Sequence, residues 1–241
     1  MRLQLITMQI VDLGTMRYCD AWAAQERAHE EVLAGGEERI LLVEHPPVIT
    51  FGRRGRIEAN VIAREEQLAR MGVEVVHSDR GGDVTFHGPG QVVAYPIVRL
   101  AEHRLSVGCY VRKLELAMIA ALAEFGISAR KDDAGIGVWV DVPGGGAAKI
   151  GALGVRIRRG ISLHGIALNV DTDLSYFDLI VPCGLAGGRV TSMRELLGDR
   201  TPPMDAARSI VAQQIAHAIQ NGESCIPSPL GTGAREDDSL L

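Results

Sequence analysis

The order of the periodic segments along the chain constrains its fold most strongly. Two long stretches have helical periodicity: one runs from Asp20, the expected N-cap, to Gly35, and the other runs from Ser106, also an expected N-cap, to Gly126. Short apolar runs bounded by Gly and Pro lie between and after them and predict strands, several of which follow one another without an intervening helix. This order does not fit the regular alternation of a doubly wound parallel sheet. It predicts a single α/β or α+β domain with a mixed sheet flanked by helices.

The same signals predict the remaining elements. A short helix is expected to start at Asn60 and end at Arg70, and a final helix is expected over Met204–Ile219. Residues 226–241 are rich in Ser, Pro, Gly and acidic residues, which predicts a disordered tail after a folded domain over residues 1–225. Strands are expected over residues 39–43, 48–51, 73–77, 91–98, 136–140, 149–157 and 161–170.

Composition limits the class of protein and its partners. Apolar residues make up 46% of the 241 residues and charged residues 23%, as in an ordinary globular protein. No apolar run approaches the roughly 18 residues that cross a bilayer, and Met1–Val11 lacks the pattern of a secretory signal, so we expect a cytoplasmic protein with no membrane partner. The net charge of −5 argues against a nucleic-acid partner.

The 4 cysteines stand alone in the sequence. No Cys-x-x-C pair and no Cys/His cluster has metal-ligand spacing, so we expect neither a disulfide framework nor a metal site. Cys183 differs from the others because Pro182 fixes the chain before it and Gly184 frees the chain after it, which predicts a kinked turn that displays the sulfur. It is the best candidate for a nucleophile.

A glycine-rich segment from Arg80 to Gly90 predicts a binding loop, because its backbone can bend sharply and come close to a ligand. It lacks the Gly-Lys-Ser/Thr of a phosphate-binding loop. A structural turn around a buried His87 is the alternative interpretation.

Two later segments add candidates. Lys149 opens an apolar strand, where partial desolvation would lower the pKa of its ammonium group and allow it to shuttle protons, although an ordinary surface lysine is an equal alternative. The small residues Gly151, Ala152 and Gly154 leave room for a ligand chain along that strand. His164 precedes a glycine within an apolar run, and a lone histidine there is more often part of the core than a catalyst.

Four motifs in order resemble those of the octanoyltransferases of lipoate synthesis. They are R-G-G-x-x-T-x-H-G-P-G-Q from Arg80, K-I-x-x-x-G-V-R from Lys149, H-G-x-A-L-N-V from His164, and P-C-G followed by V-T-S around Cys183. Each is weak alone, but the four together are highly specific.

The resemblance implies a fold shared with the catalytic domains of lipoate and biotin protein ligases. It also implies that an octanoyl group passes from octanoyl-acyl carrier protein to a lysine of lipoyl domains, in the E2 subunits of 2-oxoacid dehydrogenases and in the glycine cleavage H protein, without a cofactor. Cys183 would form the thioester intermediate, with Lys149 as its acid/base partner. The acyl pocket would be lined by Arg80, Gly81, Gly82, Asp83, Val84, Thr85, Phe86, His87, Ala152, Leu153, Gly154, His164, Gly165, Ile166 and Ala167.

Several points stay open on the sequence alone. An ATP-dependent lipoate or biotin ligase, a non-catalytic acyl-binding scaffold and, more distantly, a metal hydrolase are alternatives to a transferase. Backbone N–H groups near Gly82 or Gly184 are candidate oxyanion donors. The stretch 143–147 is longer than the usual turn of the family, and Arg53, Arg54 and Arg56 are candidates for contact with the acidic carrier.

Overall fold

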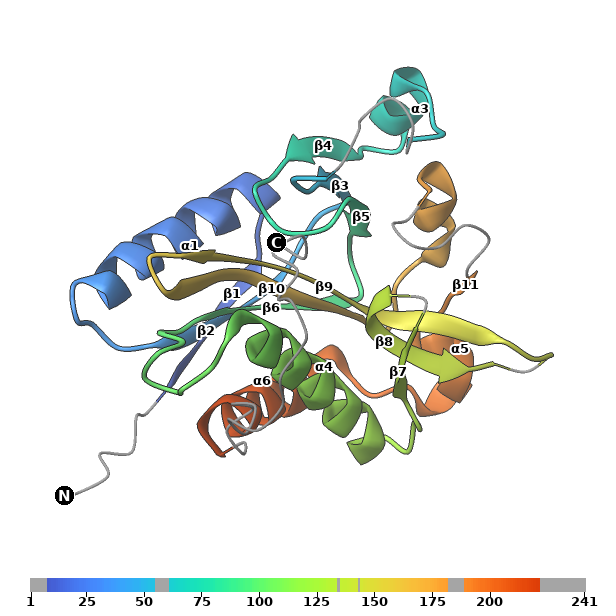
Figure 1. Cartoon of the computed structure of the whole chain (residues 1–241). Helices are drawn as coiled ribbons and strands as arrows, with labels where there is room; N and C mark the ends of the chain where they lie inside the picture. The colour runs from blue at the N-terminus through green and yellow to red at the C-terminus, as the bar shows by residue number, and fades with distance from the viewer. Residues whose placement is uncertain (1–7, 55–60, 134, 143, 182–188, 222–241) are drawn as a thin grey trace, which may run out of the picture.

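A computed structural model describes residues 8–54, 61–133, 135–142, 144–181 and 189–221 of the chain (Figure 1). Within these residues the main sheet has 8 strands, in the order β1-β2-β6-β10-β9-β8-β7 with β11 paired to β9. Most neighbours are antiparallel, but β1 is parallel to β2 and β11 is parallel to β9, so the sheet is mixed. The bounds are β1 Gln9–Thr15, β2 Arg39–Glu44, β6 Gln91–Ile97, β7 Arg130–Asp132, β8 Gly135–Asp141, β9 Ala147–Arg158, β10 Ile161–Asn169 and β11 Arg189–Val190.

A smaller sheet lies beside one end of the main sheet. Its order is β4-β3-β5, with β3 parallel to β4 and antiparallel to β5. Figure 1 shows it together with α3 at the top of the molecule. Its bounds and those of the helices are β3 Val48–Phe51, β4 Glu74–His77, β5 Val84–His87, α1 Tyr18–Leu33, α3 Glu65–Arg70, α4 Val107–Glu124, η1 Leu174–Leu179, α5 Met193–Leu197, η2 Gly198–Arg200 and α6 Met204–Asn221.

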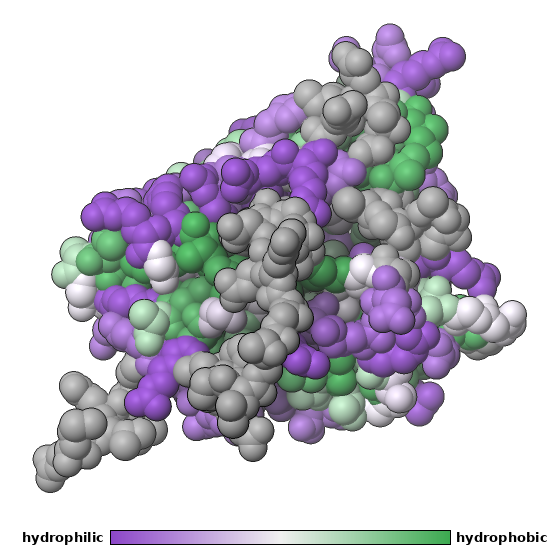
Figure 2. Space-filling view, in the orientation of Figure 1, coloured by the Kyte–Doolittle hydropathy of each residue, from purple (hydrophilic) through white to green (hydrophobic). Residues whose placement is uncertain are grey.

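Helices cover both faces of the main sheet. In β2, Ile40 and Leu42 pack in the cluster that holds α4 and α6, whereas Leu41 and Val43 pack in the cluster that holds α1. This alternation follows from the period of two residues in a strand. Because both faces are covered, every residue of the central strands β6 and β10 is buried, and most of these residues are apolar. The outer surface of α1 is hydrophilic (Figure 2), as its one-sided burial requires.

The helix α4 forms as its sequence signals predict. The Ser106 side chain accepts a hydrogen bond from the backbone N–H of Cys109 at 3.2 Å, which satisfies one of the open donors at the helix start. Gly126 follows the helix end with a φ of +76°, a conformation that suits glycine. Between them Leu114 and Met118 are fully buried against the sheet and α6.

The mixed sheet flanked by helices confirms the predicted fold class, and the main helices and most strands lie where expected. Three predictions were wrong. The first helix begins at Tyr18 after Arg17 rather than at Asp20, and the short helix begins at Glu65 after Arg64. The expected loop Arg80–Gly90 contains a strand, β5, because its alternating residues Val84 and Phe86 are buried in the small sheet. Asn60 and the expected tail 226–241 lie outside the described residues.

The cap of α4 provides a test of the fold. Replacing Ser106 by Ala removes the acceptor for the Cys109 N–H, so we expect the free energy of unfolding to fall by about 1 kcal/mol. Ser106→Asp, which keeps an acceptor, should lose little. Urea denaturation of the three proteins measures both changes, and equal midpoints for Ser106→Ala and the native chain would contradict the capping role.

Candidate active site

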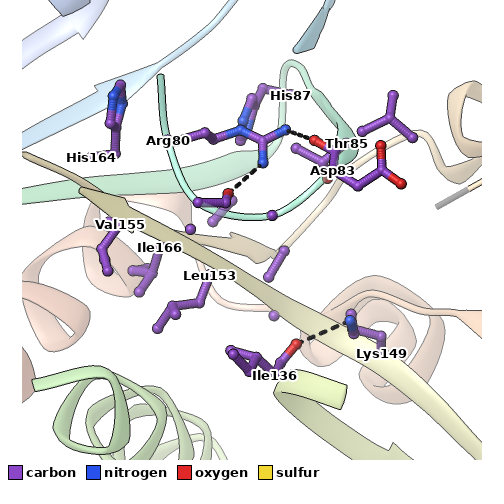
Figure 3. Close-up of a pocket in the computed structure, with 18 of the residues that line it drawn as sticks. Arg80, Asp83, Thr85, His87, Ile136, Lys149, Leu153, Val155, His164 and Ile166 are labelled. Carbon is purple, nitrogen blue, oxygen red and sulfur yellow. Dashed lines mark hydrogen bonds between the residues drawn. The ribbon is translucent and has the colours of Figure 1, made fainter. Parts of the chain in front are cut away.

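A pocket of about 320 Å³ opens between the strands β9 and β10 and the segment that leads into β5 (Figure 3). Figure 3 places Leu153, Val155 and Ile166 along the two strands, with Arg80 and His87 on the other side and Lys149 at one end. The walls are therefore apolar along the strands and polar around the opposing segment. Such a pocket, mostly apolar with a few convergent polar groups, is typical of a site for a small ligand.

Glycines allow the backbones around this pocket to approach closely. Gly154 and Gly165 pair directly across β9 and β10. A Cβ atom at Gly154 would lie 2.7 Å from the Gly81 carbonyl oxygen, and one at Gly165 would overlap the Ala94 carbonyl oxygen on β6. The Gly81 N–H in turn donates to the Val155 carbonyl oxygen at 2.9 Å, which fastens the loop to β9. The pocket thus keeps its shape through backbone contacts that a larger residue would prevent.

The Arg80 side chain holds the loop together from inside. It is 7% exposed, and its guanidinium donates to the Thr50 carbonyl oxygen at 2.6 Å, to the Asp83 carbonyl oxygen at 2.7 Å and to the Gly81 carbonyl oxygen at 3.0 Å. These bonds join β3 to the turn before β5. Arg80 also brings a permanent positive charge close to the buried histidines of the site.

A chain of amide hydrogen bonds sets the tautomer of His87. The Gln91 amide nitrogen donates to the Asn169 side-chain oxygen at 2.9 Å and to the Phe86 carbonyl oxygen at 3.2 Å, so its own side-chain oxygen is an acceptor. That oxygen lies 3.1 Å from Nδ1 of His87, which must therefore donate the proton. Burial and the nearby His45 and Arg80 lower the pKa of His87 well below its ordinary value. The ring is neutral and Nε2 carries a lone pair.

The histidines His45 and His164 are also held neutral. Burial lowers the pKa of His45 to about 4, and its ring bridges the Met16 carbonyl oxygen at 2.7 Å and the Tyr95 hydroxyl at 2.8 Å. Burial together with Arg80 and Arg156 lowers the pKa of His164 to about 3. Its Nε2 lies 2.7 Å from the Asp79 carboxylate, which also pairs with Arg156. This pairing limits how far Asp79 can favour a charged ring.

The backbone at His164 is in an uncommon conformation. Its φ is +57°, a region that non-glycine residues rarely adopt and that costs about 1–3 kcal/mol. The Gln25 side-chain oxygen holds it there by accepting from the His164 N–H at 2.7 Å. The conformation directs the ring toward Asp79 and Trp22, whose ring centroid is 5.8 Å away, and places it on the pocket wall.

Lys149 stands at an irregular point of the sheet. Val138 pairs with Gly151 and Trp139 pairs with Lys149, so β9 carries one extra residue and bulges there. The half-buried Lys149 side chain donates from Nζ to the Ile136 carbonyl oxygen at 3.1 Å, and Nζ lies 4.7 Å from the centroid of the Trp139 ring. The bulge thus directs the ammonium group into the pocket.

The structure brings most of the expected site residues to this one pocket. Phe86 lies elsewhere: it is 1% exposed and stacks on Tyr176, with ring centroids 4.7 Å apart. Cys183, Gly184 and Arg56 lie outside the described residues. The expected residues that line the pocket are Lys149, Arg80, Gly81, Gly82, Asp83, Val84, Thr85, His87, Ala152, Leu153, Gly154, His164, Gly165, Ile166 and Ala167.

Sequence reasoning missed other residues of the pocket. Gln91 and Asn169 stand within the quoted motifs, and their polar side chains in apolar strands were a signal that they are paired in the core. Tyr18 and Tyr95 gave no signal, because an aromatic residue in a buried helix face or strand reads as ordinary core. Among the described residues no group of His, Cys, Asp or Glu has an arrangement that could hold a metal ion, and no helix is long and apolar enough to cross a membrane.

Comparison with known proteins identifies the family. The model of the lipoyl protein ligase A/B catalytic domain matches residues 17–216, so the chain belongs to this family. It is similar to a curated octanoyltransferase of Chloroflexus aggregans, with 46% identity over 87% of this chain and 94% of the relative. A curated octanoyltransferase of Mycobacterium tuberculosis is 41% identical over 95% of this chain and 98% of the relative. These findings confirm the resemblance inferred from the four motifs.

The fold is also found among solved structures. A lipoate-protein ligase A with bound ATP superposes with a TM-score of 0.70 and covers 88% of this chain and 85% of that protein, at 16% sequence identity. This likeness confirms the expected fold of a lipoate ligase catalytic domain.

The buried histidines predict how stability depends on pH. The pKa of His45 is near 4 when folded and near 6.5 when unfolded, so the unfolded chain takes up the proton first as the pH falls. The stability contributed by the neutral ring is therefore present above pH 6.5 and is lost toward pH 4. Between pH 7 and 5.5 we expect His45 to account for a fall of about 1 kcal/mol in the free energy of unfolding.

Urea denaturation at the two pH values tests this expectation. The variant His45→Gln should show a smaller fall than the native chain, while His217→Gln, at an exposed position on α6, controls for the loss of a histidine. An identical pH dependence in His45→Gln and the native chain would show that His45 is not the group responsible.

Proposed function

We propose that this chain is an octanoyltransferase that moves an octanoyl group from acyl carrier protein to the lysine of a lipoyl domain. The curated relatives carry that name and match nearly the whole chain. The observation that carries the proposal is an apolar pocket with a lysine, Lys149, at one end. The alternative of a non-catalytic scaffold leaves this lysine without a role.

Cys183 is the proposed nucleophile. Its position relative to Lys149 is supported by the strand that follows it: Cys183 precedes Arg189 by six positions in the sequence, and Val190 pairs directly with Lys149. A cysteine of ordinary pKa near 8.5 is only about 3% thiolate at pH 7. The Lys149 ammonium beside it would raise that fraction.

The first half-reaction is thioester exchange. The Cys183 thiolate attacks the carbonyl carbon of the octanoyl thioester, and the bond from that carbon to the carrier sulfur breaks. The departing carrier thiolate takes a proton from the Lys149 ammonium, so the carrier leaves as a thiol and Lys149 is neutral. Backbone N–H groups such as that of Gly82, which lines the pocket, are candidates to stabilise the oxyanion.

The second half-reaction is aminolysis. The acceptor lysine has an ordinary pKa near 10.4 and must lose a proton before its nitrogen can attack. That proton goes to solvent. The neutral amine nitrogen then bonds to the acyl carbon, neutral Lys149 takes the second proton that the nitrogen loses as the amide forms, and Cys183 leaves as the thiolate. The enzyme returns to its starting state. The donor thioester is already activated, so no ATP, metal or other cofactor is needed.

The octanoyl chain would lie along the strands. Leu153, Val155 and Ile166 present apolar side chains to the pocket, and each buried methylene contributes about 0.8 kcal/mol. We place the reaction in the cytoplasm, where the reducing environment keeps an isolated thiol free.

The protein partners would meet the mouth of this pocket. Arg53 and Arg54 are exposed, and Arg54 also lines the pocket, so these charges suit contact with the acidic carrier. We propose the lipoyl domains of 2-oxoacid dehydrogenase E2 subunits and the glycine cleavage H protein as acceptors. The turn at residues 144–147 is a candidate surface for one of these partners.

Intact-protein mass spectrometry after incubation with octanoyl-loaded acyl carrier protein, without ATP, tests the proposal. We expect a mass gain of one octanoyl group on the native chain, none on Cys183→Ala, and slower formation on Lys149→Met. Cys19→Ala, which removes an exposed cysteine on α1, should gain the group as the native chain does. No adduct on the native chain, together with transfer that needs ATP, would favour a ligase instead.

A further inference from the structure

A carboxylate is buried in α4 on the side that faces the sheet. Glu115 is 3% exposed, although its neighbours along the helix face, Leu114 and Met118, belong to the apolar core. A buried carboxylate is costly unless its oxygens are paired. One oxygen, Oε1, accepts from the backbone N–H of Gly137 at 3.0 Å, and the other, Oε2, lies 3.3 Å from Nζ of Lys131.

The peptide group between Ile136 and Gly137 connects this carboxylate to the candidate active site. Its N–H, which belongs to Gly137, donates to Glu115. Its carbonyl oxygen, which belongs to Ile136, accepts from Nζ of Lys149 at 3.1 Å. Glu115 and Lys149 thus bind the two ends of one peptide group.

We propose that Glu115 is a positioning residue that acts on Lys149 through this peptide group, an inference that rests on the proposed function of Lys149. A carboxylate on the N–H side of a peptide polarises it and makes the carbonyl oxygen a stronger acceptor. The stronger acceptor holds the lysine in place and favours its ammonium form, which the Trp139 ring also favours. The ammonium form is the one that promotes the thiolate of Cys183.

The hydrogen bonds of Glu115 allow its proposed effect on Lys149 to be tested separately from its structural role in joining α4 to β8. Fastening β8 to α4 requires only an acceptor for the Gly137 N–H, which the amide oxygen of a glutamine also supplies. The effect on Lys149 requires the negative charge. Glu115→Gln therefore removes the charge and keeps the acceptor. The other charged or titratable groups are unchanged in this variant. Among the described residues they are Lys131 beside Glu115, Arg130 and Asp132 on the neighbouring strand β7, Arg189 on β11, and the pocket residues Arg54, Arg80, Asp83, His87, His164, Tyr18 and Tyr95.

Competitive labelling of lysines with acetic anhydride over a pH series measures the titration of Lys149 in the full chain, with the labelled peptide quantified by mass spectrometry. We expect the midpoint for Lys149 in Glu115→Gln to fall by about half a pH unit or more. In Glu124→Gln, the same exchange at an exposed position of α4, it should stay at the native value. Urea denaturation of each variant reports whether the fold is intact.

A second variant should move the titration midpoint of Lys149 in the opposite direction. Lys131→Met removes the positive partner of Glu115, so the midpoint for Lys149 should rise. If Glu115→Gln does not fold, Lys131→Met still tests whether charge at Glu115 affects the titration of Lys149. Unchanged Lys149 midpoints in the folded variants would overturn the proposal.

The rate of the octanoyl adduct on Cys183 separates this inference from the proposed function. At pH 7 we expect Glu115→Gln to form the adduct about three- to tenfold more slowly than the native chain, because a Lys149 ammonium that the Ile136 carbonyl oxygen holds less firmly stabilises the Cys183 thiolate less. If the native chain forms no adduct, the proposed function fails, while the labelling of Lys149 still decides whether Glu115 acts on it. A native adduct with equal rates in both proteins would overturn the role of Glu115.

Discussion

Close contact between backbones is the constraint on which the site depends. Gly154 and Gly165 sit opposite each other on β9 and β10, and neither position has room for a Cβ atom because carbonyl oxygens of the loop and of β6 lie against them. The hydrogen bond from Gly81 to Val155 then holds the loop over the strands. This contact forms a largely apolar pocket between the main sheet and the segment that leads into β5.

Hydrogen bonds among the polar groups around the pocket set their orientations. The Asn169, Gln91 and His87 side chains form a chain that assigns each donor and acceptor, and burial keeps His87 neutral. Lys149 lies at the other end, where a bulge and the Ile136 carbonyl oxygen set its direction. A buried polar group without a hydrogen-bond partner costs free energy, so such a network favours a single orientation of its side chains. The site therefore places a neutral histidine at one end of the pocket and Lys149 at the other.

The sequence predicts the fold class and most elements because hydrophobic periodicity and capping signals are local. It misses β1, an edge strand whose residues are largely exposed, and β5, whose four residues lie inside a glycine-rich segment. The motifs identify Lys149 and most of the pocket residues. They cannot show that Phe86 turns into the core or that Tyr18 and Tyr95 reach the pocket, since these depend on strand order and on packing between distant segments. Glu115 was equally invisible, because only the fold brings it to the peptide group beside Lys149.

In the proposed mechanism the octanoyl group is carried by the enzyme itself between the two half-reactions. The most direct measurement is a single-turnover chase, in which the octanoylated enzyme is freed of carrier and mixed with a lipoyl domain without ATP. For a covalent transferase we expect the octanoyl mass to leave the enzyme and to appear on the lipoyl domain at the same rate. An octanoyl group that stays on the enzyme, or reaches the lipoyl domain only when ATP is added, would contradict this mechanism.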